Sequence, residues 1–167
     1  RLQHTLQRQP AVDQRVSDFI EHDEEVFAAQ DGGAGLLPAI ARQLRAHAHP
    51  FRPPVAVISG GETTVTLRGK GKGGRCSEFL LSLAIELSGL ERTWALAADT
   101  DGVDGAEANA GAIVAPDALA RAASLGLDAK GRLADNDGFG FFSALGDLVV
   151  TGPTRTNVND FRIILVQ

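Results

Sequence analysis

Apolar residues recur at helical spacing in the first third of the chain. Between Ala11 and Gln30 they fall on one side of a helical wheel, and the glycine-rich run at 31–35 would end such a helix. The same spacing predicts a second helix from Leu36 to about His47. The chain is therefore expected to start with a helical N-terminal extension.

A proline-rich stretch at residues 49–54 separates this extension from a different pattern. Proline restricts its own backbone and that of the residue before it, so this stretch is expected to be a stiff linker. We therefore expect two parts, a helical lead-in with its linker at 1–50 and a main domain at 51–167.

Strand patterns begin directly after the linker. Val55–Ile58 is a continuous apolar run typical of a buried strand, and residues 62–68 alternate, so the two are expected to form a hairpin. Asp135 or Asn136 is expected to cap a short aromatic helix. Further strands are expected at 93–98, 111–114, 148–151 and 161–166, and helices at 79–87 and 116–125. This interleaving defines an α/β fold with a mixed sheet and flanking helices.

Composition limits the partners of this chain. Its 167 residues are 44% hydrophobic and 22% charged, with a net charge of −5, which is ordinary for a globular domain and disfavours general nucleic-acid or membrane binding. A single cysteine excludes an internal disulfide. No apolar run approaches the roughly 18 residues that a membrane span requires, and no signal peptide is recognisable. Without any methionine the chain is expected to be a fragment or processed piece, with the cytoplasm as its default location.

The most unusual stretch is residues 59–75, which holds six glycines and four basic side chains. Glycine lets the backbone approach a ligand closely, and Arg and Lys suit phosphate or carboxylate groups. The stretch therefore predicts an anion-binding loop, with a flexible solvated turn as the alternative. It formally contains Gly-x-Gly-x-x-Gly at Gly69, Gly71 and Gly74, but a lone match of this kind is a weak dinucleotide signal.

Two further polar loops follow expected strands. Residues 99–105 carry Asp99, Asp101 and Asp104, whose mutual repulsion calls for a cation, a cationic ligand or helix amides; oxygen ligands of this kind suit Mg²⁺. Residues 151–160 are dense in hydrogen-bonding side chains. Ligands of open α/β sheets collect at strand ends, so the polar loops at 59–61, 99–105 and 152–157 are expected to share a site, although Asx-turns and an elaborate loop remain the simpler alternatives.

All four histidines precede residue 50, and the single cysteine has no histidine partner in the main domain. Nucleophilic catalysis by this domain is therefore disfavoured. Chemistry that depends on positioning and charge neutralisation, phosphoryl transfer above all, stays open.

Four motifs occur in an order that is specific for one family: Ser59–Val65, Gly69–Arg75, Asp99–Gly105 and Thr151–Asp160. Together they closely resemble the C-terminal, so-called MOFRL, domain of the class II glycerate 2-kinases, some of which are labelled hydroxypyruvate reductases. The resemblance covers residues 55–167. Residues 1–50 match only loosely, as a helical remnant of the larger N-terminal domain of that family.

The resemblance implies ATP-dependent phosphorylation of D-glycerate to 2-phosphoglycerate, with Mg²⁺, in a cleft between two domains. The family places a catalytic lysine on the N-terminal domain, so this chain alone is expected to be inactive. Arg75 and Asp101 would be catalytic, with Arg75 neutralising phosphate charge, and Asp99, Asp101 and Asp104 would hold the metal. The residues implied in substrate or phosphate binding are Gly60, Gly61, Glu62, Lys70, Lys72, Gly73, Gly74, Thr154 and Asn157.

Two departures from the family pattern concern these motifs. Cys76 and Ser77 stand where Asn-Gln is usual, and Arg155 stands where Gly is usual. Either could alter the substrate or its affinity. The expected partners are a small 2-hydroxy acid and the N-terminal domain, with a homo-oligomer left open. An NAD(P)H-dependent hydroxypyruvate reductase and a stand-alone anion-binding module are the alternatives.

Overall fold

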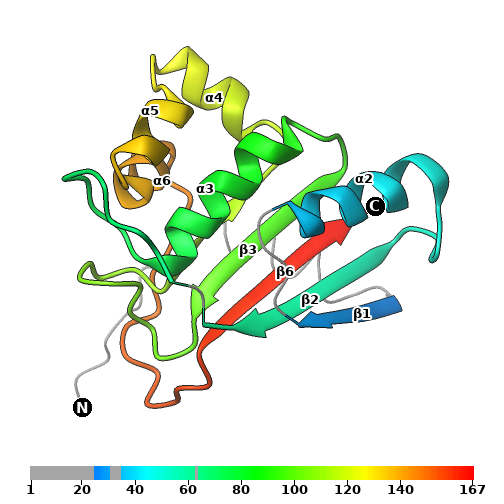
Figure 1. Cartoon of the computed structure of the whole chain (residues 1–167), viewed down its shortest axis with the longest axis horizontal. Helices are drawn as coiled ribbons and strands as arrows, with labels where there is room; N and C mark the ends of the chain where they lie inside the picture. Colours follow the sequence, from blue (N-terminus) through cyan, green and yellow to red (C-terminus); the bar gives the residue numbers. More distant parts are fainter. Residues whose placement is uncertain (1–24, 31–34, 63) are drawn as a thin grey trace, which may run out of the picture.

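A six-stranded mixed sheet forms the base of the protein in the computed structural model, which describes residues 25–30, 35–62 and 64–167 (Figure 1). The strand order is β1-β2-β6-β3-β4-β5. β1 pairs with β2 in parallel, and every other neighbouring pair is antiparallel. The strands are β1 (Glu25–Gln30), β2 (Val55–Gly61), β3 (Thr93–Asp99), β4 (Gly111–Val114), β5 (Leu148–Val149) and β6 (Asp160–Val166).

Helices cover one face of this sheet in the view of Figure 1. The longest helix lies centrally over β3, with one helix beside it over β2 and β6 and three short helices gathered on its other side. The helices are α2 (Leu36–His47), α3 (Arg75–Leu87), α4 (Ala118–Ser124), α5 (Ala129–Ala134) and α6 (Gly138–Leu145). The expected strand and helix pattern from residue 36 onward is largely confirmed.

An apolar core lies between the sheet and the helices. Leu44 of α2 and Leu80 of α3 pack against Val57 of β2 and Ile164 of β6, and each is at most 2% exposed. Truncating a buried leucine of this kind to alanine typically costs about 2–5 kcal/mol. Helix α2 contributes to the same core as residues 51–167. The domain boundary expected at residue 50 stays a prediction.

The register of β6 brings three chain segments to one edge of the sheet. β6 lies between β2 and β3 and is antiparallel to both, so its first residue sits beside their last ones. Asp160 is the register partner of Gly61 on one side and of Asp99 on the other. The loops that follow β2 and β3, and the loop that precedes β6, therefore meet at this edge.

The helix expected over residues 11–30 is wrong where it can be compared, because residues 25–30 form β1. Residues 11–24 lie outside the described residues. Val26 and Phe27 are strand formers as much as helix residues, and parallel pairing with β2 provides hydrogen bonds along one side of the β1 backbone. Short apolar runs of this kind do not distinguish the two structures by spacing alone.

The expected hairpin of 55–58 with 62–68 is also wrong. Residues 62 and 64–68 form no strand, and the edges of β2 are already taken by β1 and β6. The sheet is mixed, as expected, but the parallel pair that makes it so is β1 with β2.

The third difference concerns the helices near residue 130. The short helix α5 was not expected, and the cap of α6 is Asp137 rather than Asp135 or Asn136. The Asp137 carboxylate accepts a hydrogen bond from the backbone N–H of Gly140 at 3.2 Å. Asp135 and Asn136 have a different role, which concerns the candidate site.

Candidate active site at the start of helix α3

Arg75, the first residue of α3, lies at the sheet edge where the three segments meet. Its Nη1 donates to Oε1 of Glu62 at 2.5 Å, and its Nη2 donates to Oδ2 of Asp99 at 2.9 Å. The same Nη2 lies 3.3 Å from Oδ1 of Asp160. Three carboxylates from β3, β6 and the segment after β2 therefore hold one guanidinium group, whose side chain is 31% exposed.

Beneath this contact lies a second arginine. Arg162 Nη2 donates to Oδ2 of Asp160 at 2.9 Å, and both side chains are almost fully buried. The Arg162 guanidinium lies 4.6 Å from the ring centre of Phe79 on α3, a cation–π distance. Asp160 thus contacts two arginines, one buried and one facing solvent.

Electrostatics keep Arg75 charged. Burial alone would lower the pKa of Arg75, but the neighbouring Asp160, Glu62 and Asp99 outweigh burial and raise it. With every group ionised, two arginines face three carboxylates, so the cluster carries a net charge of −1. Additional positive charge nearby would therefore favour the approach of a phosphate group to Arg75.

Asp104 caps the start of α3 rather than joining this cluster. Its two carboxylate oxygens accept from the backbone N–H groups of Cys76, at 2.9 Å, and Ser77, at 2.8 Å. Burial raises the pKa of Asp104, while these hydrogen bonds oppose that rise. A carboxylate at a helix N-terminus also interacts favourably with the helix dipole.

The two departures at Cys76 and Ser77 therefore concern the helix start. Both side chains are fully buried, and Ser77 Oγ accepts from the Gly74 backbone N–H at 3.0 Å. Burial raises the pKa of the Cys76 thiol, which keeps it protonated. Neither residue lines the two pockets beside Arg75.

The glycine-rich loop 68–74 is held by the turn between α5 and α6. Asn136 Oδ1 accepts from the backbone N–H groups of Arg68, at 2.7 Å, and Gly69, at 2.9 Å. Asp135 and Asp137 accept from the next N–H groups of the loop, those of Lys70, Gly71 and Lys72, through carboxylate and carbonyl oxygens. The backbone N–H groups of residues 68–72 are thus bonded within the protein and are not available to cradle a phosphate.

Two glycines of this loop are explained by the same contact. A Cβ at Gly69 would overlap the backbone of Asp135, and one at Gly71 would overlap Asp137. A Cβ at Gly74 would overlap Asp104. Close approach of two backbones, rather than approach of a ligand, requires glycine here.

The other two loops also bond to each other. Thr154 donates its N–H to the carbonyl of Asp101 at 2.9 Å and its hydroxyl to the carbonyl of Thr100 at 2.5 Å. The Asn157 amide lies 3.4 Å from Oδ2 of Asp101, whose Oδ1 accepts from the Val103 N–H at 2.8 Å. Thr154 and Asn157 therefore buttress the 99–105 loop.

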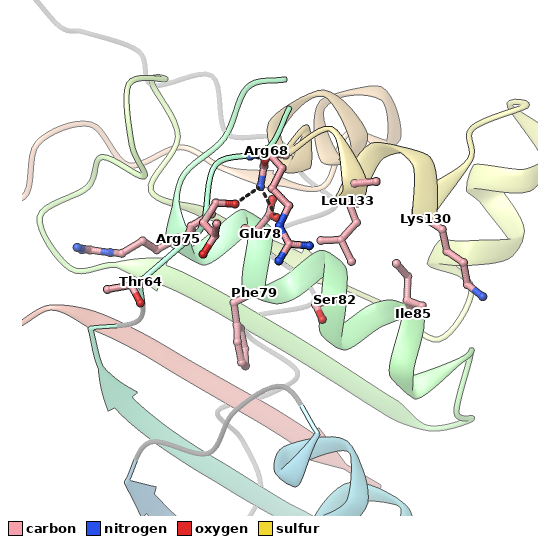
Figure 2. Close-up of a pocket in the computed structure, with 13 residues that line it drawn as sticks. Thr64, Arg68, Arg75, Glu78, Phe79, Ser82, Ile85, Lys130 and Leu133 are labelled. Carbon is pink, nitrogen blue, oxygen red and sulfur yellow. Dashed lines mark hydrogen bonds between the residues drawn. The ribbon is translucent and has the colours of Figure 1, made fainter. Parts of the chain in front are cut away.

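Two pockets adjoin Arg75. One, of about 410 Å³, is lined by Gly73, Gly74, Arg75 and Asp99 together with apolar residues of neighbouring loops. The other, of about 610 Å³, runs along the exposed face of α3 toward Lys130 of α5, and Figure 2 shows Ser82 and Ile85 on its helical side. Arg75 and Glu78 line both pockets.

The structure brings together only part of the predicted site. Arg75, Glu62 and Asp99 are in direct contact, with Gly60 and Gly61 at the end of β2 beside them and Gly73 and Gly74 in the smaller pocket. Asp101 lies in the adjoining loop. Lys70, Lys72, Thr154 and Asn157 line neither pocket, and Lys72 pairs instead with Glu107 at 3.3 Å.

The expected site residues did not include three contributors, Asp160, Arg162 and Asn136, although Asp160 ends the fourth motif and Asn136 was expected as a helix cap. Alternation along β6 places Asp160 and Arg162 on the same face as the core residues Ile164 and Val166, which is the signal that could have identified a buried ion pair. Nothing local distinguishes Asn136 from an ordinary helix cap.

The three aspartates of the 99–105 loop do not converge on one point. Within the described part of the chain, no group of three or more His, Cys, Asp or Glu side chains is placed to hold a metal ion. Asp104 uses both oxygens on helix amides, and Asp99 accepts from Arg75 and from the Asp101 N–H. Asp101, half-buried and with a long Asn157 contact, is the carboxylate of the three that best fits a metal shared with phosphate oxygens.

Fold and site together define an α/β domain with an arginine–carboxylate centre at a sheet edge. A family model described as the MOFRL family matches residues 55–160. The chain is 50% identical to a putative hydroxypyruvate reductase of Agrobacterium vitis, over 78% of this chain and 30% of that protein. It is 39% identical to the D-glycerate 2-kinase of Thermotoga maritima, over 78% of this chain and 31% of that protein.

A solved structure agrees with these sequence matches. The crystal structure of a glycerate kinase from Thermotoga maritima matches with a TM-score of 0.81 and 33% identity, covering 92% of this chain and 38% of that one. The chain belongs to the MOFRL family. It spans about a third of the length of the curated relatives that it matches. In the part described by the structure, no helix has the length and apolar character needed to cross a membrane.

Proposed function

We propose that this chain is the C-terminal part of a glycerate 2-kinase-like enzyme that transfers a phosphoryl group from ATP to D-glycerate, giving 2-phosphoglycerate. The observation that carries the proposal is Arg75, a permanently charged guanidinium fixed by three carboxylates between two pockets, in a chain whose relatives include proteins named glycerate kinase. Phosphoryl transfer depends on positioning and on neutralising phosphate charge, which is what such an arginine supplies.

Arg75 would bind the transferring phosphoryl group. A guanidinium has five N–H donors, and its hydrogen bonds to Glu62 and Asp99 leave others for phosphate oxygens. Glu62, whose side chain is 57% exposed, is the contact that an incoming phosphate would most readily replace. Asp99 and Asp160 are buried and would keep the guanidinium in place.

Mg²⁺ would neutralise the charge of the nucleotide phosphates. Asp101 is the protein carboxylate that would best serve as its ligand. Because the cluster around Arg75 carries a net charge of −1, added cations would favour polyphosphate binding here. This supports a site shared with another domain, at an interdomain cleft that contributes a lysine. The isolated chain is then inactive, and ATP consumption by it in the presence of D-glycerate would contradict this point.

Hydroxypyruvate reduction is the second candidate, favoured by the name of the Agrobacterium vitis relative. Its motif would be Gly69, Gly71 and Gly74. That motif does not follow a strand, and the backbone donors of residues 68–72 are occupied by residues 135–137. A dinucleotide fingerprint needs both a preceding strand and available N–H groups, so the kinase is the better supported function.

The test is a coupled assay of the complete gene product that contains this chain, with ATP, Mg²⁺ and D-glycerate. We expect formation of 2-phosphoglycerate and ADP in equal amounts. Oxidation of NAD(P)H by hydroxypyruvate without any kinase activity would select the reductase. Neither reaction, combined with phosphate binding, would select the stand-alone anion-binding module.

A further inference from the structure

Two residues of β6, Asp160 and Arg162, form a buried ion pair directly beneath Arg75. We call them the β6 pair. Arg162 is 1% exposed and Asp160 3% exposed, which makes Arg162 the largest fully buried side chain in the described part of the protein. Charges so deeply buried are costly, and apolar residues of similar volume are often as stabilising, so a buried pair is weak evidence for a purely structural role.

The sheet provides space for this pair. The register neighbours of Arg162 are Ser59 on β2 and Ala97 on β3, both with small side chains. The long Arg162 side chain lies over them and under the Phe79 ring, so three elements fix its position. Its hydrogen bond to Oδ2 of Asp160 then fixes the carboxylate.

The other oxygen of Asp160 faces the solvent-side arginine. Oδ1 lies 3.3 Å from Nη2 of Arg75, the same nitrogen that donates to Asp99. A carboxylate held on one side by a buried arginine offers the other arginine a fixed partner. Glu62, by contrast, is exposed and replaceable.

We propose that the β6 pair is a positioning device for Arg75, holding its guanidinium in the orientation that meets the transferring phosphoryl group. The proposal rests on the kinase function proposed above. Asp160 touches no reacting atom and acts through Arg75. Its effect should therefore fall on kcat more than on KM, because Arg75 is needed most when phosphate charge develops in the transition state.

The test compares Asp160→Asn with Asp147→Asn in the complete gene product. Asp147 is a matched control: it is a buried carboxylate that pairs with Arg121 at 2.5 Å, and it lines neither pocket beside Arg75. We expect D160N to lower kcat at least about tenfold with KM values changed less than about threefold. We expect D147N to keep kcat within about twofold while lowering the melting temperature comparably.

A double-mutant cycle with Arg75→Lys separates positioning from general destabilisation. If Asp160 acts through Arg75, D160N should lower kcat less than about twofold further in the R75K background. Equal losses in both backgrounds, or a D160N kcat no lower than that of D147N, would overturn the proposal. Should D160N not fold, Arg162→Lys replaces it, with an expected kcat loss of about fivefold and the same cycle.

A readout without turnover distinguishes this proposal from the kinase itself. In the protein labelled with ¹⁵N-arginine, the Arg75 guanidinium, assigned by its loss in R75K, should give separate slowly exchanging N–H signals in wild type and D147N. These signals should merge or exchange rapidly in D160N or R162K. Unchanged signals would refute the positioning role, whereas wild type without glycerate phosphorylation would refute only the function on which it rests.

Discussion

The glycine-rich loop at 68–74 and the arginine that follows it are adjacent in the chain, yet the loop contacts the helical layer and the arginine contacts the sheet. The loop is bonded through its backbone N–H groups to Asp135, Asn136 and Asp137 in the helical layer. Arg75 is bonded through its side chain to carboxylates at the sheet edge. The start of α3 is thus fixed from two sides, and Arg75 lines both of the adjoining pockets.

The loop therefore has a structural role, and Arg75 has an electrostatic one. The loop sets where α3 begins, and its sequence is dictated by backbone packing. Arg75 supplies the charge, and its orientation is set by the sheet. Changes in the loop should therefore act first on stability, and changes around Arg75 should act first on catalysis.

The largest stability effect is expected for Gly69→Ala. A Cβ at Gly69 overlaps the Asp135 backbone, and neither segment can retreat without breaking hydrogen bonds, so we expect a loss of about 3 kcal/mol in the free energy of unfolding. Gly35→Ala is the control, since a Cβ there meets nothing within 4 Å, and it should change stability by less than about 1 kcal/mol. Urea denaturation measures both. Equal losses of stability in the two variants would show that the Asp135 backbone does not restrict the loop.

A somewhat smaller effect is expected for Asn136→Ala. This change leaves the N–H groups of Arg68 and Gly69 without their shared acceptor and removes the 2.8 Å hydrogen bond to Glu78, which should cost about 2 kcal/mol. Asn157→Ala, in an exposed loop, should cost less than about 0.5 kcal/mol by the same denaturation measurement. A larger loss of stability in Asn157→Ala than in Asn136→Ala would show that Asn136 does not hold the loop.

Asp137→Asn tests the electrostatic part of the contact between the loop and residues 135–137. Burial alone would raise the pKa of Asp137, but hydrogen bonds from the Lys72 and Gly140 N–H groups and the Arg132 ion pair outweigh it and lower the pKa below its usual 3.8. Because the folded pKa is lowered, the stabilisation is present above about pH 4 and is lost as pH falls through the folded value. The free energy of unfolding of wild type should exceed that of D137N by about 1 kcal/mol at pH 7, and this difference should shrink in acid. A difference that grows in acid would show that folding raises the pKa of Asp137 instead of lowering it.

The smallest effect is expected for Arg155→Gly, which lies outside both regions. Arg155 has a φ of 63°, a conformation that favours glycine. Relief of this strain and the added freedom of the unfolded chain oppose each other, so we expect a gain of about 0.5 kcal/mol at most. Thermal unfolding measures it. A loss greater than about 1 kcal/mol would show that the Arg155 side chain supports the loop.

Much of the architecture could be predicted because it depends on local periodicity. The apolar runs of β2 and β3 and the stripe of α3 identify themselves from spacing alone. β1 was missed because its assignment depends on pairing with a strand 30 residues later, and the 62–68 hairpin was expected because nothing local reveals that β6 occupies that edge of β2. Long-range pairing decided both cases.

The site shows the same division. Arg75 and Asp99 were identifiable because a basic residue after glycines and an acidic residue at a strand end are local signals. The role of the glycines could not be identified from the sequence, because it depends on Asp135–Asp137, which lie more than 60 residues away. Asp104 carries the same charge as Asp99, and only the fold shows that it caps α3.

The proposed role of Arg75 is tested most directly by the rate of 2-phosphoglycerate formation by the complete gene product carrying Arg75→Ala. Arg42→Ala, which removes an exposed arginine of α2, is the control. Loss of the phosphate-neutralising group should lower kcat about 1000-fold in R75A, while R42A stays within about twofold of wild type and both variants remain folded. Activity of R75A within about tenfold of wild type would contradict this role, because Arg75 would then not be the group that the sheet edge holds for catalysis.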